Sequence, residues 1–268
     1  MRNADSNFSL NVDGMSGTEF HDVEIRGKDS IYIFVECYID KNAGPEPRLV
    51  EDQLEFVTNG VAQTVQLEAW GQNVARLNAL TVERDMRLTA EQPYVVFDSL
   101  VVASGATLTI DPGARVLFHD KASLIVDGRL EAVGKPGQMI HLRGERSDKV
   151  LPDLTYEEMA SQWRGVRIGA GSFDNHLEYV DMRSTETGLV IDSCGDLSRS
   201  KLLIVNSWLH NSAGHVLTSS HARVDAYGTI FSDAALGVLS LTGGKHEIVQ
   251  CTLANYYLFA GPSGPIVR

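Results

Sequence analysis

The segments Ile204-Val-Asn-Ser-Trp-Leu-His-Asn211, Ala226-Tyr-Gly-Thr-Ile-Phe-Ser-Asp233 and Ile248-Val-Gln-Cys-Thr-Leu-Ala-Asn255 align with one another when the sequence is shifted by 22 residues. The first position is apolar in each segment, the sixth is Leu, Phe and Leu, and the eighth is Asn, Asp and Asn. A fixed period of this length is typical of a solenoid, in which each repeat stacks on the one before it.

The length and pattern of the repeat indicate β-strands rather than helices. Paired helices need about 30 to 45 residues per repeat and space their apolar residues by three or four, whereas these segments alternate. A turn of 22 residues has room for three short strands, and successive turns lie about 4.8 Å apart in a parallel sheet. We therefore expect Leu209, Phe231 and Leu253 to form one file inside a narrow solenoid.

Two further features set the expected register. Asn211, Asp233 and Asn255 are expected at a turn, because Asn and Asp tolerate left-handed backbone angles. Residues 177–184 align with residues 204–211 at an interval of 27, five more than the repeat, and we expect the extra residues to bulge at 194–200.

Residues 1–74 have a different pattern, that of an antiparallel β-sandwich. Asn59-Gly60 separates two alternating segments, which predicts a hairpin because both residues can take positive φ. About five strands can be counted, whereas an immunoglobulin-like sandwich has about seven. We expect a partial immunoglobulin-like β-sandwich whose first strands are missing.

The rest of the chain divides into a connector and the solenoid. Residues 75–92 mix charges without a clear period, and Pro93 closes them, so we assign a connector there. From residue 93 to residue 268, short strands separated by Asp-Pro-Gly and Asp-Gly turns predict a parallel β-helix. Residues 146–162 break this pattern and predict a short helical insertion, capped by Asp153 or by Thr155 with Glu158 at its third position.

Composition excludes several functional classes. The net charge of −12 repels nucleic acid, and the sequence has no basic stripe that would override it. Its three cysteines lack metal-binding spacing, and no cofactor motif is present. No apolar run reaches the 18 residues of a membrane span, and the first residues do not have the pattern of an export signal.

Six segments of the sequence carry a resemblance to a known family: Leu108-Thr-Ile-Asp-Pro-Gly113, Gln162-Trp-Arg-Gly-Val166, and residues 22–35, 67–73, 93–101 and 251–256. They resemble a family of Bacteroidetes lipoproteins in which an immunoglobulin-like domain precedes a right-handed parallel β-helix. The resemblance implies an export signal with a lipid-anchored cysteine, further turns after residue 257, and a location in the cell envelope: outer membrane, surface or periplasm. We therefore expect the chain to be truncated at both ends. The resemblance supplies no catalytic residues.

Charged residues on the 22-residue grid are the candidates for chemistry. Asp181, Arg183 and His210, with Asp233 nearby, are the candidate catalytic residues, because neighbouring turns bring equivalent positions within about 5 Å. Against catalysis, His210 is followed in its column by Ser232 and Ala254, which is typical of a solvated turn residue. No metal site is expected, because His210, His215 and His221 lack the spacing of zinc ligands.

Aromatic residues offer a second kind of candidate site. Trp163, Trp208 and Tyr179 are candidate ligand-binding residues, because aromatic faces stack on the C–H edges of sugars. The alternative is packing, with Trp208 in a turn or the core and Trp163 anchoring the insertion.

Three functional hypotheses follow. The first is a non-catalytic scaffold at the cell surface or in the periplasm that presents a lateral face to a glycan or a protein partner. The alternative is a polysaccharide lyase or glycoside hydrolase, which we expect to place three or more charged side chains together in a groove on one lateral sheet. The third is self-association through the exposed strand edges of a last turn without a cap.

Overall fold

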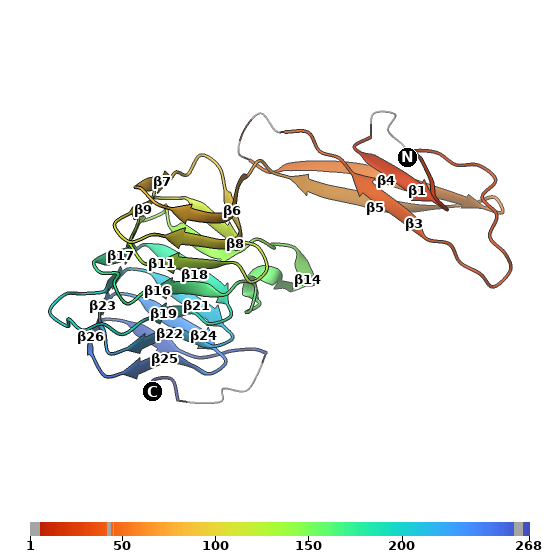
Figure 1. Cartoon of the computed structure of the whole chain (residues 1–268). Helices are drawn as coiled ribbons and strands as arrows, with labels where there is room; N and C mark the ends of the chain where they lie inside the picture. The colour runs from red at the N-terminus through yellow and green to blue at the C-terminus, as the bar shows by residue number, and fades with distance from the viewer. Residues whose placement is uncertain (1–5, 42–43, 45, 260–264) are drawn as a thin grey trace. The chain divides into compact units, whose positions relative to one another are not determined.

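The structure is a computed structural model that describes residues 6–41, 44, 46–259 and 265–268. The chain forms two compact units, Met1–Asn73 and Val74–Arg268. Figure 1 labels many of the strands of the two units, which are described separately below.

The first unit consists of antiparallel β-structure. Strands β1 (Phe8–Val12), β2 (Met15–Gly17) and β3 (Ile33–Cys37) form a sheet in the order β2-β1-β3, while β4 (Arg48–Thr58) and β5 (Val61–Gly71) form a long hairpin. The hairpin turn has positive φ at both Asn59 and Gly60, as predicted. A small core of Leu10, Val12 and Leu54 lies inside this unit. The immunoglobulin-like assignment stays a prediction.

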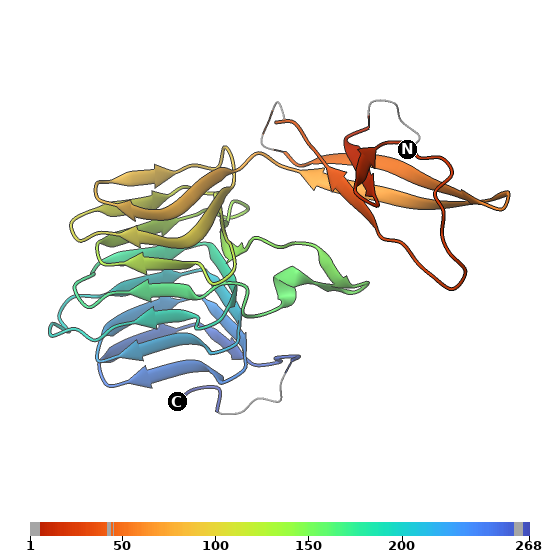
Figure 2. The ribbon, with the colours of Figure 1, turned by 45° about the vertical axis from the view of Figure 1, so that its right-hand side comes forward.

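The second unit is a parallel β-solenoid of about eight turns, stacked as Figure 2 shows. Face 1 consists of β10 (Arg115–Phe118), β13 (Ile140–Gly144), β18 (Val180–Thr185), β21 (Trp208–Ser212), β24 (Ile230–Ala234) and β27 (Thr252–Ala254). Face 2 consists of β11 (Ser123–Val126), β16 (Gly165–Ile168), β19 (Leu189–Ile191), β22 (His215–Ser220) and β25 (Gly237–Thr242).

Face 3 forms a separate sheet. Its strands are β7 (Met86–Leu88), β9 (Thr107–Ile110), β12 (Arg129–Val133), β17 (Asn175–Glu178), β20 (Leu202–Val205), β23 (Arg223–Tyr227) and β26 (Lys245–Val249). Strands β6 (Ala75–Val82) and β8 (Tyr94–Val102) each run from face 1 into face 2, because the two halves of β8 pair with β10 and β11 respectively.

Apolar side chains form vertical files inside the solenoid, as the repeat predicted. Leu209 pairs with Phe231, and Phe231 with Leu253, at matching positions of β21, β24 and β27. The interval of 27 residues is also confirmed, since Leu177 pairs with Ile204. The extra residues lie between β19 and β20. Strand side chains alternate in direction, so each file inside has a polar or exposed file beside it on the outer surface.

Residues in the left-handed conformation mark the corners. Asn211 and Asp233 have the predicted left-handed conformation, with φ of 55° and 58°, and are the second-to-last residues of β21 and β24, where face 1 ends. Asn255 acts through its side chain, whose Oδ1 accepts from the Ala234 N–H at 3.0 Å and whose Nδ2 donates to the Ala234 carbonyl at 2.9 Å.

The predicted connector is wrong. Within residues 75–92, β6 pairs in parallel with β8 and β7 pairs in parallel with β9, so this segment contains strands of the first turn of the solenoid. Its inward residues Val82 and Leu88 are buried. The charges that concealed the pattern lie on the outer surface and at the bends, where water solvates them.

The insertion at 146–162 exists, but its conformation differs from the prediction. It forms a small antiparallel hairpin of β14 (Lys149–Leu151) and β15 (Leu154–Thr155), followed by a single 3-10 turn, η1 (Tyr156–Glu158). Thr155 stands at the N-cap but makes no side-chain capping bond. The hairpin uses the residues that a longer helix would have needed.

Two further observations concern the surface of the fold. No helix in the described part of the chain combines the length and apolar character needed to cross a membrane. Strand β26 has one neighbouring strand in its sheet, and β27 has one neighbour along face 1 among the described residues. Self-association through these edges stays a prediction.

Candidate functional site

The outer surface of face 1 carries a group of charged side chains that we call the charged cluster. Parallel stacking places His141, Asp181 and Trp208 in one outward file, because His141 pairs with Asp181 and Asp181 with Trp208. Arg183 and His210 pair in the neighbouring file. The charged cluster consists of Arg115, His141, Arg143, Glu157, Asp181, Arg183 and His210.

Asp181 lies at the centre of the charged cluster, with a side chain only 8% exposed. Its Oδ1 is 3.0 Å from His210 Nε2 and its Oδ2 is 3.2 Å from His141 Nδ1. Burial alone would raise the pKa of Asp181, but the hydrogen bonds with both histidines and the charge of Arg183 outweigh it and hold that pKa well below its usual range. Asp181 is therefore a fixed anion at neutral pH.

Glu157 comes from the 3-10 turn of the insertion and bridges two arginines on face 1. Its Oε1 is 3.1 Å from Arg143 Nη1, and its Oε2 is 2.9 Å from Arg183 Nη2. Burial lowers the pKa of Arg143, and the charge of Glu157 acts in the opposite direction. Both oxygens of Glu157 are thus held by guanidinium groups.

The three candidate aromatic residues have different environments. Trp208 is 43% exposed and stacks on His210, with ring centroids 4.4 Å apart. Trp163 is fully buried, stacks on Phe118 at 3.9 Å, and donates from Nε1 to the Arg183 carbonyl at 2.8 Å. Tyr179 is half-buried at a corner with φ of 48°. Trp208 is therefore the one of these three whose ring is available to a ligand on face 1.

The remaining predicted site residue, Asp233, does not join the charged cluster. Its Oδ2 accepts from Ser232 Oγ at 2.8 Å, and its Oδ1 accepts from the Tyr256 N–H at 2.9 Å. These bonds give Asp233 a structural role at its corner. The other three predicted catalytic residues, Asp181, Arg183 and His210, do come together.

Four members of the charged cluster were missed in the sequence: Arg115, His141, Arg143 and Glu157. His141 and Arg143 lie in the turn before Asp181, but the insertion separates His141 from Asp181 by 40 residues, which conceals the repeat. Glu157 lies in the insertion itself, outside any repeat. The weak signal was the polar alternation His141-Leu-Arg143 after Ile140, which has the same pattern as Asp181-Met-Arg183.

No metal centre is formed within the residues that the structure describes, because no group of three or more His, Cys, Asp or Glu side chains has suitable geometry. His215 instead lies on face 2, where its Nδ1 is 2.9 Å from the Gly237 carbonyl. His221 adopts a left-handed conformation at another corner.

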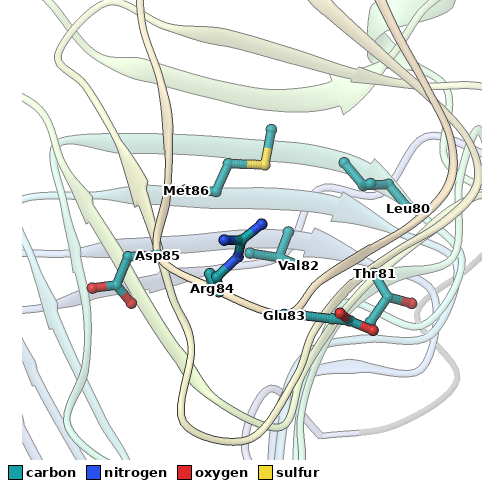
Figure 3. Close-up of a pocket in the computed structure, with 7 residues that line it drawn as sticks. All are labelled: Leu80, Thr81, Val82, Glu83, Arg84, Asp85 and Met86. Carbon is teal, nitrogen blue, oxygen red and sulfur yellow. The ribbon is translucent and has the colours of Figure 1, made fainter.

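A separate hollow lies at the first turn of the solenoid, lined by Leu80, Thr81, Val82, Glu83, Arg84, Asp85 and Met86. Figure 3 shows these side chains, with Asp85 pointing away from Leu80, Val82 and Met86. Asp85 accepts a hydrogen bond from the Thr107 N–H of the next turn at 2.9 Å. All the lining residues come from one continuous segment, and no group of polar atoms converges on the hollow from several turns.

Comparisons with known proteins give one partial similarity. No family model and no solved structure matches the chain. A segment of 82 residues, 31% of this chain, is 34% identical to Protein bark beetle of Drosophila melanogaster. The chain thus spans about 2% of the length of that protein. The similarity is to one stretch of a much longer protein, so it assigns neither a family nor an activity.

Proposed function

We propose that this protein is a non-catalytic β-solenoid scaffold whose face 1 binds a glycan. The observation that carries the proposal is Trp208, a partly exposed indole stacked on His210 beside the charged cluster. An aromatic face next to fixed hydrogen-bonding groups is suited to a sugar, because the ring contacts C–H edges while the polar groups contact hydroxyls. Ile230, the next residue in the Trp208 file, is 40% exposed and extends the apolar part of this surface.

The shape of the surface also favours binding of an extended chain. Face 1 is a parallel sheet whose outward files run along the solenoid, with one residue of each file per turn. Solenoids provide extended binding surfaces of this kind. A polymer can therefore meet the charged cluster and the Trp208–Ile230 strip at the same time.

The state of the carboxylates argues against glycoside hydrolysis. A glycosidase needs one carboxylic acid whose pKa is raised, so that it carries a proton for the leaving group. Asp181 has a lowered pKa, and Glu157 is held by two arginines. Neither carboxylate is suited to be the acid.

A polysaccharide lyase is the second candidate, and the charged cluster favours it, because more than three charged side chains lie together on one lateral sheet, as expected for the enzyme. The Arg143–Arg183 pair beside His210 combines cations that can neutralise a substrate carboxylate with a side chain that can accept a proton. In this structure Glu157 occupies that pair. The location at the cell envelope and the lipid anchor rest on the family resemblance and are part of the proposal.

The test is a titration of the full chain with neutral and acidic oligosaccharides by isothermal calorimetry. We expect binding to weaken at least tenfold in Trp208→Ala, because aromatic anchors dominate such interfaces. Trp70→Ala is the matched control, since Trp70 is also exposed but belongs to the first unit. Equal affinity in wild type and Trp208→Ala would refute the proposal, and release of unsaturated sugars would replace it with the lyase.

A further inference from the structure

The insertion leaves the solenoid after β13 and returns before β16, and we call its residues 146–162 the strap. Figure 2 shows it in green, projecting from the side of the stacked turns. Its tip is exposed, with Val150 and Leu151 open to solvent. Its return segment is tied to β18, because the N–H groups of Ser161 and Gln162 donate to the carbonyls of Thr185 and Ser184.

Glu157 supplies the ion pairs between the strap and the outer surface of face 1. Besides the two arginine contacts, the Glu157 carbonyl accepts a hydrogen bond from Ser184 Oγ at 2.7 Å. The backbones of Arg143 and Arg183 belong to strands β13 and β18 of the solenoid, and Arg143 Nη1 also donates to the Gly144 carbonyl at 3.1 Å. The solenoid therefore supplies the two guanidinium groups, and the strap supplies the carboxylate that lies between them.

We propose that Arg143 and Arg183 form a binding site for the oxyanion of a ligand, and that the Glu157 carboxylate occupies this site until such a ligand displaces the strap. The inference rests on the proposed function and specifies it further: the glycan carries carboxylate or sulfate groups. Planar guanidinium groups bind carboxylate and sulfate oxygens through paired hydrogen bonds.

Unused hydrogen-bonding capacity supports the displacement. Arg183 Nε is buried and has no hydrogen-bond partner, and its distance of 3.8 Å to Asp181 Oδ2 is too long for one. The Glu157 carboxylate contacts one terminal nitrogen of each arginine. A ligand oxyanion that reaches both Nε and Nη2 of Arg183 would satisfy a donor that Glu157 leaves unpaired.

The local positive charge increases when the strap leaves. With Glu157 in place, its carboxylate and that of Asp181 oppose the guanidinium groups of Arg115, Arg143 and Arg183. Without Glu157, Asp181 alone opposes these three. The exposed surface then attracts an anion despite the negative net charge of the whole chain, because salt screens exposed charges that lie more than about 8 to 10 Å away.

The test compares Glu157→Ala with Glu158→Ala, which removes the same charge from the exposed neighbouring residue. Each full-length variant is titrated with an oligogalacturonate, a sulfated oligosaccharide and neutral cellohexaose. We expect Glu157→Ala to bind one or both acidic probes about tenfold more tightly than wild type, with cellohexaose unchanged and Glu158→Ala equal to wild type. The two acidic probes distinguish carboxylate from sulfate. Equal affinity of wild type and Glu157→Ala for both acidic probes would overturn the inference.

A second measurement separates this inference from the proposed function. Tryptic cleavage after Lys149 reports release of the strap, and inorganic sulfate reports the arginine site without any sugar. We expect faster cleavage and a sulfate-dependent rise in Tm in Glu157→Ala but not in Glu158→Ala. If no oligosaccharide binds to any variant, the proposed function fails while these two readouts still decide the arginine site. If both readouts are unchanged, the site is refuted even where Trp208→Ala abolishes glycan binding.

Discussion

Replacement of Phe231 by Ala tests the stacked core of the solenoid. Phe231 is fully buried and lies between Leu209 and Leu253 in the same file. An aromatic side chain of this kind buries about 150 Å², and at about 25 cal/mol per Å² its loss removes about 4 kcal/mol. This value lies within the range of about 3 to 5 kcal/mol measured for Phe→Ala in other cores. We expect the free energy of unfolding of the solenoid to fall by that amount.

The assay is urea denaturation followed by circular dichroism, with Ile230→Ala as the matched control. Ile230 is the preceding residue of the same strand, but it points outward and is 40% exposed. Its replacement should cost less than about 1 kcal/mol, because most of the lost contact is with water. If the two variants were equally stable, or if Phe231→Ala cost less than the control, the inward file would be refuted.

Three further predictions concern the site and the turns that support it. Asn175→Ala should lower the free energy of unfolding by about 1 to 3 kcal/mol, because Asn175 Oδ1 accepts a hydrogen bond from the buried Leu130 N–H at 2.7 Å. Faster hydrogen exchange of the Leu130 amide in the variant would confirm the loss of this hydrogen bond. Gly188→Ala should lower the Tm, because Gly188 has a φ of 73° and a Cβ there would lie 2.1 Å from a backbone oxygen. Gly171→Ala is the control and should leave the Tm unchanged, because the space around Gly171 is open. Asp181 has a lowered pKa in the folded state, so its contribution is complete above its unfolded pKa of about 3.9 and is lost as the pH falls further. The difference in unfolding free energy between wild type and Asp181→Asn should therefore shrink between about pH 5 and pH 3, and a constant difference would contradict the ion-pair account.

The sequence was sufficient to predict the solenoid where the repeat was regular. Leu209, Phe231 and Leu253 recur at one interval because each must fill the same place in the next turn, and Asn211 and Asp233 recur because each occupies the same corner. The hairpin at Asn59-Gly60 was equally predictable, since the turn geometry depends on those two residues alone.

The first turn and the strap were not predictable from local pattern. Strand β6 includes charged Arg76 on its outer side, so its inward residues do not stand out in a single sequence. In the strap, Tyr156–Glu158 has residues compatible with a helix, but β14 and β15 pair first and leave room for one 3-10 turn. Tertiary context outweighed helix propensity there.

The charged cluster was predicted in part for a related reason. Asp181, Arg183 and His210 lie on consecutive turns with a known interval, so the repeat places them together. His141 reaches Asp181 across the strap, and Glu157 reaches Arg143 from within it, so neither contact follows any period. An insertion of irregular length therefore hides the residues that complete the site.

The most direct test of the glycan-binding face is the solvent accessibility of Trp208 in the presence of ligand. In Trp70→Phe, Trp208 is the solvent-exposed tryptophan of the chain, because Trp163 is fully buried. Acrylamide quenching of this variant should fall when a saturating oligosaccharide covers face 1. If an oligosaccharide binds by calorimetry and the quenching of Trp208 is unchanged, the ligand lies elsewhere and the proposed binding face is wrong.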